Sequence, residues 1–563
     1  MKMGAGSGQL SEISESSTRV AGRDAQSTNI SAARALGDVV RTTLGPGGLD
    51  KMLVGSDGKV IVTNDGASIV DRLDVEHPAA RAVVAVASQQ GDHVGDGTTT
   101  AVVLTGALLA EAERLLERGL HPTTVTDGYH RAAERVAELL RRDAVAVDAD
   151  DTERLEAVAR TAITGKWDAE ATTFLARRAV ETVRAVTRDG QVDFDRITRK
   201  AVSGGSVFDS RVVEGLVVDT GSSSTEVVSP EPGPPRRTDD ASVALVDDGL
   251  TVDTVDGARV TVDSAADIER FQAYEDEVYE EHVERIVDAG ADVVFCQQSI
   301  DDAARYLLAK EGVLAVERTR EDELHKLARA TGAGIVAKTT ELTADSTGRA
   351  GVVERRPVGP TRLVVVGDCA DTEQVSVLLR GPTERIAEET KRVVDGCFYA
   401  LRHAVGGSVV PGGGATEVGL ARELRGAADG MSGREAFAVR SFADALEVIP
   451  RTLAETAGLD AIDTLLELRT RHHEGESTVG VAVEAGGVDD VLERGVVEPT
   501  RVKQHAIEGA AEAANVLLRV DDIVAAAGDG GRGGDAHDHG HDHSHGPGEA
   551  VESADGYPWT LGH

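Results

Sequence analysis

The sequence feature that most constrains this chain is the stretch Gly95-Asp96-Gly97-Thr98-Thr99-Thr100, which runs directly into the apolar residues 101–109. We expect a helix to begin within the threonines, because good helix formers continue to Leu116 before Gly119 and Pro122. The first turn of a helix has unpaired N–H groups and a partial positive charge, so it can bind an anion. The hydroxyl groups add donors and the glycines allow close approach of the backbone. The stretch therefore predicts a phosphate site.

Asp96 adds a second requirement to this site, because a carboxylate beside a phosphate is repulsive unless a cation lies between them. We therefore expect a divalent metal, Mg²⁺, held by Asp96 and by the phosphates of a nucleotide. A simpler alternative is a capped helix after a glycine turn, and this would be preferred for an isolated Asp-Gly-Thr-Thr. The rest of the chain has to decide between the two.

Length and charge limit the function. A chain of 563 residues is too long for one core and indicates about two to four domains. The 97 acidic residues against 59 Lys and Arg give a net charge of −38, which argues against a nucleic-acid partner and against an anionic membrane. Such self-repulsion is tolerated in concentrated salt, where the screening length falls to about 3 Å at 1 M, so we expect the salt-rich cytoplasm of a halophilic microbe.

No apolar run approaches the roughly 18 residues of a membrane span, and residues 1–22 lack the apolar segment of a signal peptide, so a soluble cytoplasmic protein is expected. Cys296, Cys369 and Cys397 have no metal-ligand spacing and are expected to be reduced, buried thiols.

The pattern along the chain is helical, then α/β, then helical. Residues 30–44 have helical periodicity, 59–63 resemble a strand before the turn Asn64-Asp65-Gly66, and 125–142 and about 150–200 appear helical. From about 201 to 370, short β-branched runs at 242–246, 292–296 and 361–366 alternate with acidic helical stretches, notably 268–289. The Pro/Ser-rich segment 229–235 is expected to be a loop. Helices are expected again from about 380 to 527.

The segment 528–563 is rich in Gly, His and Asp and is expected to be disordered. Its Gly528-Asp529-Gly530-Gly531-Arg532-Gly533 matches GxGxxG formally, but no strand precedes it, so no dinucleotide site is expected. Its histidines are more simply explained as solvated low-complexity sequence than as ligands of a transition metal. They are His537, His539, His541, His543 and His545.

Several further motifs stand in a fixed order, and no Walker A sequence is present. Together they resemble a subunit of the group II chaperonins, the thermosome type of archaea, from about residue 22 to about residue 527. The motifs are Leu44-Gly45-Pro46, Asn64-Asp65-Gly66, Gly95-Asp96-Gly97-Thr98-Thr99-Thr100, Thr164-Gly165-Lys166, Pro411-Gly412-Gly413-Gly414-Ala415-Thr416-Glu417 and Val497-Glu498-Pro499-Thr500-Arg501-Val502-Lys503.

The resemblance implies a multidomain fold of α+β and α/β parts. A mostly helical equatorial ATP-binding domain would comprise residues 23–148 and 404–527, a small intermediate hinge domain 149–216 and 371–403, and an inserted α/β apical domain with a lid protrusion 217–370. It also implies two stacked rings of identical or paralogous subunits that enclose non-native client proteins. ATP and Mg²⁺ would be the cofactors, with K⁺ as a further cation.

The resemblance also assigns roles within the site. Asp96 would hold Mg²⁺, and Asp65 would help to position metal and attacking water. Asp395, sixteen residues before the Pro of the Gly-rich loop, would accept a proton from that water when the hinge closes. The implied nucleotide-binding residues are Leu44, Gly45, Pro46, Gly97, Thr98, Thr99, Thr100, Thr164, Gly165, Lys166, Gly412, Gly413, Gly414, Glu498 and, more weakly, Lys503.

Three departures from the family pattern bear on activity. Gly47 stands where the family usually has lysine, the paired acids before the phosphate loop are reduced to Gly91-Asp92, and the tail is rich in His and Asp. They suggest a divergent paralogue. Two hypotheses follow: an ATP-driven folding machine, or a structural, holding subunit of a mixed ring that hydrolyses ATP poorly. A small-molecule kinase is disfavoured, because no motif for an acceptor substrate is present.

Overall fold

The computed structural model describes residues 19–55, 58, 60–219, 237–252, 265–358, 361–369 and 374–524. The chain divides into two units, one formed by residues 22–521 and one in which β1 (Arg19–Ala21) pairs antiparallel with β21 (Asp522–Val524). The expectations for the loop 229–235, the tail 528–563 and nearly all of residues 1–22 lie outside the described residues. None of the described helices is both long and apolar enough to cross a membrane.

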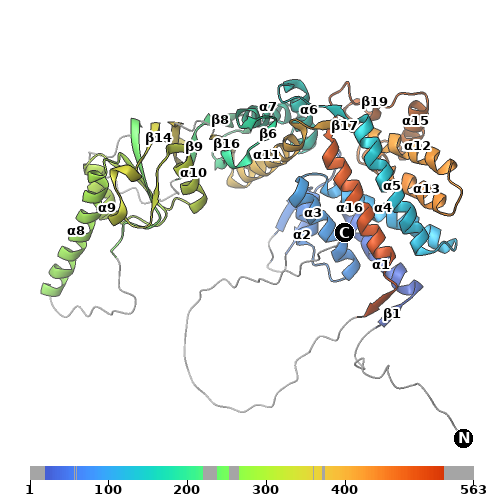
Figure 1. Cartoon of the computed structure of the whole chain (residues 1–563), viewed down its shortest axis with the longest axis horizontal. Coiled ribbons are helices and arrows are strands. Elements are labelled where there is room, and N and C mark those ends of the chain that lie inside the picture. Colours follow the sequence, from blue (N-terminus) through green and yellow to red (C-terminus); the bar gives the residue numbers. More distant parts are fainter. Residues whose placement is uncertain are drawn as a thin grey trace, which may run out of the picture. The chain divides into compact units, whose positions relative to one another are not determined.

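Helices from both ends of the chain share one core, which we call the helical core. α4 lies at its centre, buried on most of its faces, and packs against α1, α3, α13 and α16. Figure 1 shows α4 and α16 side by side although about 400 residues separate them in the chain. The helices of this core are α1 (Arg23–Arg41), α3 (Pro78–Val94), α4 (Thr98–Glu117), α5 (Pro122–Asp143), α12 (Ala415–Asp429), α13 (Glu435–Leu446), α14 (Val448–Thr456), α15 (Ala461–His473) and α16 (Thr500–Leu518).

The predicted start of α4 within the threonines is confirmed, since its first residue is Thr98. α1 ends at Arg41, earlier than the expected residue 44, because the chain turns into the loop 42–50. The strand β3 (Val60–Thr63) is confirmed, and it forms a hairpin with β2 (Lys51–Val54), which the sequence analysis did not predict. The short helix α2 (Gly66–Arg72) begins at the last residue of the Asn64-Asp65-Gly66 turn.

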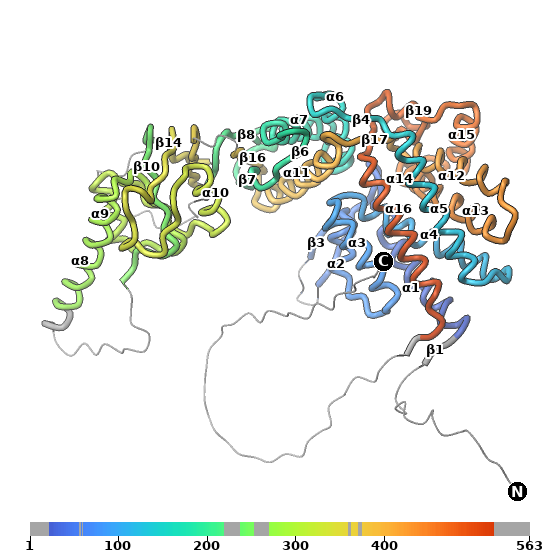
Figure 2. The backbone as a smooth tube through the Cα atoms, in the orientation of Figure 1, coloured from blue at the N-terminus to red at the C-terminus, as the bar shows by residue number. Residues whose placement is uncertain are grey.

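Two separate chain segments form a second core, the middle core, whose path can be followed in Figure 2. Its helices α7 (Ala169–Ala185) and α11 (Glu384–Ala404) pack on a three-stranded sheet, and α6 (Thr152–Ile163) packs on these two helices. In that sheet, β16 (Val375–Gly381) lies between the parallel β7 (Ile197–Ser203) and the antiparallel β8 (Arg211–Glu214).

The expectation of helix up to residue 200 is wrong after Ala185. The chain turns through Asp189 and Gly190, both with positive φ, between β5 (Thr187–Arg188) and β6 (Gln191–Val192). It then forms β7, whose partner β16 lies far away in the sequence, so local periodicity carries no signal for this strand.

A third core, the sheet core, is built on a seven-stranded sheet with the order β12-β11-β10-β14-β15-β9 and β13 paired to β10. α10 (Glu321–Thr331) covers one face, and α8 (Ala265–Asp288) and α9 (Asp302–Lys310) cover the other. The predicted strands and the helix at 268–289 are confirmed. The strands are β9 (Leu216–Asp219), β10 (Arg237–Val246), β11 (Val293–Cys296), β12 (Leu314–Val316), β13 (Ile335–Val336), β14 (Gly348–Val358) and β15 (Thr361–Cys369).

Short strands complete the helical and middle cores. β17 (Ser408–Pro411) pairs with β20 (Val497–Pro499) and β4 (Val145–Ala146), and β18 (Val479–Ala482) pairs with β19 (Gly487–Asp490). The three cysteines are buried and form no disulfide with one another, as predicted, and burial raises the pKa of Cys296 and Cys397.

A buried ion-pair network joins three helices of the helical core. Glu447, between α13 and α14, has no exposed surface and accepts from both Arg425 of α12, at 2.7 and 2.8 Å, and Arg469 of α15. Burial alone would raise the pKa of Glu447, but the two guanidinium groups lower it below its ordinary value.

Glu447→Ala should lower the free energy of unfolding of this region by about 3 kcal/mol, because it leaves two arginines without their buried partner. Native-state hydrogen exchange of amides in α13 and α15 measures this loss. Glu476→Gln, at the exposed pair with Arg471, is the matched control and should cost less than about 1 kcal/mol. Because the folded-state pKa of Glu447 is lowered, its contribution is present at neutral pH and disappears as the pH falls through that pKa. Equal losses in the two variants at neutral pH would contradict the assignment.

Candidate active site

The N-terminus of α4 is open toward the predicted phosphate loop. Gly95, which ends α3, and Gly97, which precedes Thr98, have φ of 75° and 78°, a conformation that favours glycine. No side chain caps the first turn of α4. Its N–H groups are therefore available to an anion, as the sequence predicts.

Asp96 lies at this open end. Its Oδ1 accepts from the Gly97 N–H at 2.6 Å, and the surrounding protein desolvates the carboxyl and raises its pKa to about 6. The negative charges of Glu498 and Asp65 add to this rise, and Lys166 opposes it. Two other carboxyl groups thus disfavour the ionised form of Asp96, an arrangement that a bound cation would stabilise.

The donor set fits Mg²⁺ when a nucleotide supplies part of the coordination. In the described part of the chain, no group of three or more His, Cys, Asp or Glu side chains is placed to hold a metal ion. Mg²⁺ at Asp96 would therefore take its remaining ligands from phosphate oxygens and water, which is how this ion is commonly held in nucleotide sites.

Asp65 caps the next element, α2. Its Oδ2 accepts from the N–H of Ser68 at 3.0 Å and from its hydroxyl at 2.7 Å, and its Oδ1 lies 3.5 Å from Arg392 of α11. Burial tends to raise the pKa of Asp65, but these partners and Lys166 hold it below its ordinary value. Asp65 is therefore an ionised acceptor.

The loop that carries Thr164, Gly165 and Lys166 meets both earlier loops. The Lys166 ammonium donates to Asn64 Oδ1, and desolvation lowers the pKa of this lysine, with a further lowering by Arg392. Gly165 has φ of 82°, and a Cβ on it would lie 2.7 Å from the Cα and the carbonyl O of Pro46. The structure thus brings together the segments 44–46, 64–65 and 164–166, which are distant in the sequence.

Gly47 is also packed against backbone. A Cβ at this position would lie 2.3 Å from the carbonyl O of Thr456 at the end of α14. The departure from the usual lysine thus coincides with a loop that has no room for a side chain at this point.

The Gly-rich loop and Glu498 form another side of the site. The Gly412 N–H donates to Val496 O at 2.9 Å, which holds the loop 412–414 against the strand that carries Glu498. Lys503 is 2% exposed and pairs with Glu417 at 2.6 Å and Glu498 at 2.7 Å. Lys503 therefore acts on this side of the site by holding Glu498.

Asp395 is the acidic residue of the predicted site whose hydrogen bond is made away from the nucleotide loops, although both it and Asp96 add to the rise that burial causes in the pKa of the Cys397 thiol. Among the described residues, the hydrogen-bonding partner of Asp395 is Arg199 of β7, with Nη1 to Oδ1 at 2.9 Å. Burial raises the pKa of Asp395, and Arg199 counteracts that rise. No hydrogen bond or ion pair links Asp395 to Asp65 or Asp96 within the part that the structure describes.

The sequence analysis missed two side chains that support the site. Gln90 of α3, 1% exposed, donates to the Asp96 carbonyl at 2.6 Å, and its Oε1 lies 2.6 Å from Nδ1 of His505. Arg392 contacts Asp65 and stands one helical turn before Asp395. The sequence signal that could have indicated Gln90 is a polar residue among the apolar positions of the buried face of α3. The sequence around Arg392 contains no comparable signal.

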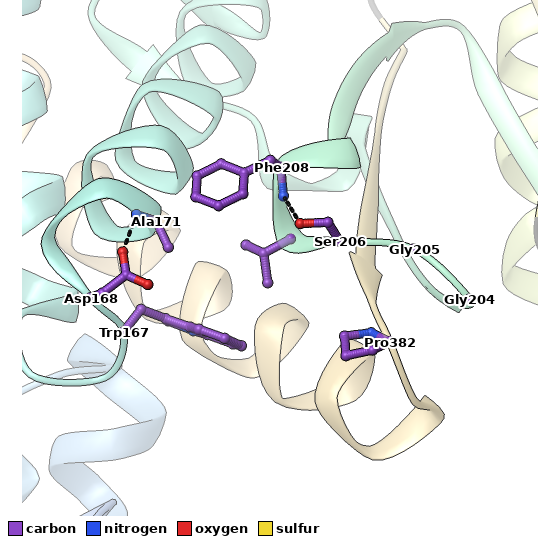
Figure 3. A pocket seen from close by; sticks show the side chains of 9 residues that line it. Trp167, Asp168, Ala171, Gly204, Gly205, Ser206, Phe208 and Pro382 are labelled. Atoms are coloured by element: carbon purple, nitrogen blue, oxygen red, sulfur yellow. Dashed lines mark hydrogen bonds between the residues drawn. The ribbon is translucent and has the colours of Figure 1, made fainter.

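A surface pocket of about 550 Å³ lies beside the Lys166 loop, between α7 and the turn 204–208. Figure 3 shows Trp167 and Phe208 on two sides of this pocket, with Pro382 at its edge. None of the predicted site residues lines it, so the pocket is distinct from the candidate active site.

Gly165→Ala should weaken nucleotide binding at least about tenfold, because the added Cβ pushes the Lys166 loop away from Pro46. A fluorescent ATP analogue titrated onto the full-length protein measures the affinity. Gly190→Ala is the matched control: Gly190 has a similar φ of 76°, but a Cβ there meets nothing within 4 Å. Both variants carry the backbone strain, of about 1–2 kcal/mol. If both bind nucleotide like the native protein, contact between the two loops does not matter for binding.

The sequence is similar to known proteins over almost its whole length. The model of the TCP-1/cpn60 chaperonin family matches residues 36–527. The chain is 46% identical to the thermosome subunit of Methanopyrus kandleri over 93% of its own length and 96% of that relative's. It is 46% identical to thermosome subunit alpha of Halobacterium salinarum over 94% of both chains, and 45% identical to thermosome subunit beta of Archaeoglobus fulgidus over 93% and 97%. The chain therefore belongs to the TCP-1/cpn60 chaperonin family, and within it resembles the thermosome subunits of the group II chaperonins.

Proposed function

We propose that this protein is an ATP-driven chaperonin subunit, in which Mg²⁺-dependent ATP hydrolysis drives the enclosure and folding of non-native proteins. The observation that carries this proposal is the convergence of three distant loops and the acidic Asp96 near the uncapped N-terminus of α4. Such an arrangement suits a nucleoside triphosphate and its metal ion, because it offers both N–H donors and a carboxylate.

Each side of the site has a role in this proposal. Asp96 holds Mg²⁺, which neutralises charge on the phosphates, and the loop with Gly45 covers them. Asp65 positions metal and water, Lys166 senses the nucleotide, and Glu498 contacts ribose and base. The remaining contacts come from Leu44, Pro46, Gly97, Thr98, Thr99, Thr100, Thr164, Gly165, Gly412, Gly413 and Gly414, with Lys503 holding Glu498.

Hydrolysis needs a carboxylate that accepts a proton from the attacking water, and we assign this role to Asp395. Its present partner is Arg199 rather than any residue of the phosphate loop. Asp395 must therefore move toward the attacking water before hydrolysis. This movement would link the reaction to a shift of α11 and hence to closure of the chaperonin.

The cores support a division of labour along the chain. We assign the helical core to an equatorial ATP-binding domain (23–148 and 404–527), the middle core to an intermediate domain (149–216 and 371–403) and the sheet core to an apical, client-binding domain (217–370). The subunit would assemble into a cytoplasmic double ring. Relatives named alpha and beta in one organism support a ring with paralogous subunits.

Asp395→Asn should reduce ATP hydrolysis at least about 100-fold, since an amide cannot accept the proton, while ATP binding stays near the native value. The measurement is steady-state hydrolysis in molar KCl with Mg²⁺, with binding followed by a fluorescent analogue. Glu388→Gln, at another carboxylate of α11 that pairs with Lys391, is the matched control and should keep its activity. Native-like hydrolysis by Asp395→Asn would show that a different group activates the water.

The second candidate is a structural, holding subunit with low activity of its own. Three observations favour this second candidate. Gly47 replaces the usual lysine, Arg392 forms an ion pair with Asp65, and Arg199 forms an ion pair with Asp395. Sedimentation of the purified protein beside the hydrolysis assay separates the two. Ring-sized particles that hydrolyse ATP support the self-sufficient machine, and small inactive particles support a subunit that requires its paralogues.

A further inference from the structure

Strand β7 lies between the proposed catalytic carboxylate and a helix of the sheet core. Its side chains alternate between two faces. Ile197 packs in the middle core with α11, whereas Val202 packs in a separate cluster with residues of β9, β14 and β15. The consecutive residues Arg199 and Lys200 therefore point to opposite sides of one strand.

On the α11 side, Arg199 pairs with Asp395 at 2.9 Å, and both side chains are about one-third exposed or less. Among the residues described, Arg199 forms no hydrogen bond or ion pair with the phosphate loop or with any predicted nucleotide-binding residue. Its effect on the reaction therefore has to pass through Asp395.

On the other side, the Lys200 ammonium pairs with Glu323 in the first turn of α10. Glu323 is 2% exposed and Lys200 is 13% exposed, so the pair is largely shielded from salt. The pair holds β7 against α10. Arg199 is also close enough to α10 to act on Lys326. Burial of Lys326 lowers its pKa, Asp322 opposes that lowering, and Arg199 contributes a smaller lowering.

We propose that Arg199 is a positioning residue for Asp395, and that β7 links this pair to α10 through Lys200 and Glu323. The inference rests on the proposed role of Asp395. Arg199 holds the Asp395 carboxylate in place and keeps it ionised for proton acceptance, and a displacement of α10 is transmitted to Arg199 along the rigid strand.

The charges around Asp395 decide the direction of the pH effect. Burial raises its pKa and Arg199 lowers it, with smaller contributions from Lys391 and Glu388 of the same helix. Removal of Arg199 therefore raises the pKa of Asp395 further. On α10, Lys326 is the charged group whose pKa responds to Arg199.

The first test is the pH profile of single-turnover ATP hydrolysis by full-length Arg199→Gln. We expect the acid limb of the profile to move upward by about one pH unit or more, with the affinity for ATP unchanged. Arg199→Lys, which keeps the positive charge, should restore most of the native profile. Sedimentation and ATP binding verify that each variant is folded and assembled. A variant with purely structural damage would lose rate equally at every pH, and an unmoved acid limb would overturn the inference.

The second test is a double-mutant cycle between Glu323→Gln and Arg199→Gln. Glu323→Gln should slow single-turnover hydrolysis several-fold when Arg199 is present and change it less than about twofold in the Arg199→Gln background. Independent, multiplicative effects would show that β7 does not link the two pairs.

The controls also separate this inference from the proposed function. If Asp395→Asn hydrolyses ATP normally, the role of Asp395 is wrong. If it is inactive while Arg199→Gln keeps the native pH profile, only the role of Arg199 is wrong.

Discussion

The burial of α4 is the constraint on which the rest of the structure depends. Helices from the first 143 residues and from the last part of the described chain enclose it, so the two ends of the sequence have to fold together. Because its sides are covered by apolar packing, the end that starts at Thr98 is where its backbone N–H groups remain unpaired. The proposed phosphate site is thus a consequence of where the core leaves one helix end open.

The second constraint is electrostatic. Burial of its carboxyl raises the pKa of Asp96, and the negative charges of Glu498 and Asp65 add to that rise. Protein groups relieve part of it: Arg392 and Ser68 stabilise ionised Asp65, and Lys503 pairs with Glu498. Asp96 has the Gly97 N–H as its hydrogen-bond donor and keeps a raised pKa, so it is the position where a cation gains most.

Local features of this chain could be predicted from its sequence. The start of α4, the strands within 237–246, 293–296 and 361–369, and the burial of three thiols each depend on residues that are neighbours in the chain. Three other features could not be predicted from the sequence. These are the parallel pairing of β7 with β16, the pairing of β3 with β2 in a hairpin, and the hydrogen bond from Gln90 to Asp96. Each of these three features depends on a contact with a second residue or strand, and the sequence around the first one does not indicate which residue or strand that is. The ion pair between Arg199 and Asp395 joins residues 196 positions apart, and either residue alone resembles an ordinary surface charge.

Helix α11 connects two parts of the proposed mechanism, because it carries both Arg392 and Asp395. Residues three apart lie on neighbouring parts of a helix surface, yet Arg392 contacts Asp65 in the nucleotide region and Asp395 contacts Arg199 on β7. A rotation or shift of α11 cannot change one of these ion pairs without straining the other, because a helix moves as a rigid body over so short a distance. Release of Asp65 from Arg392, which frees it for metal and water, would therefore occur in the same movement that brings Asp395, with Arg199 as its positioning partner, to the attacking water. Two acidic groups with separate tasks would become available together, and ATP bound before that movement would be held without being hydrolysed.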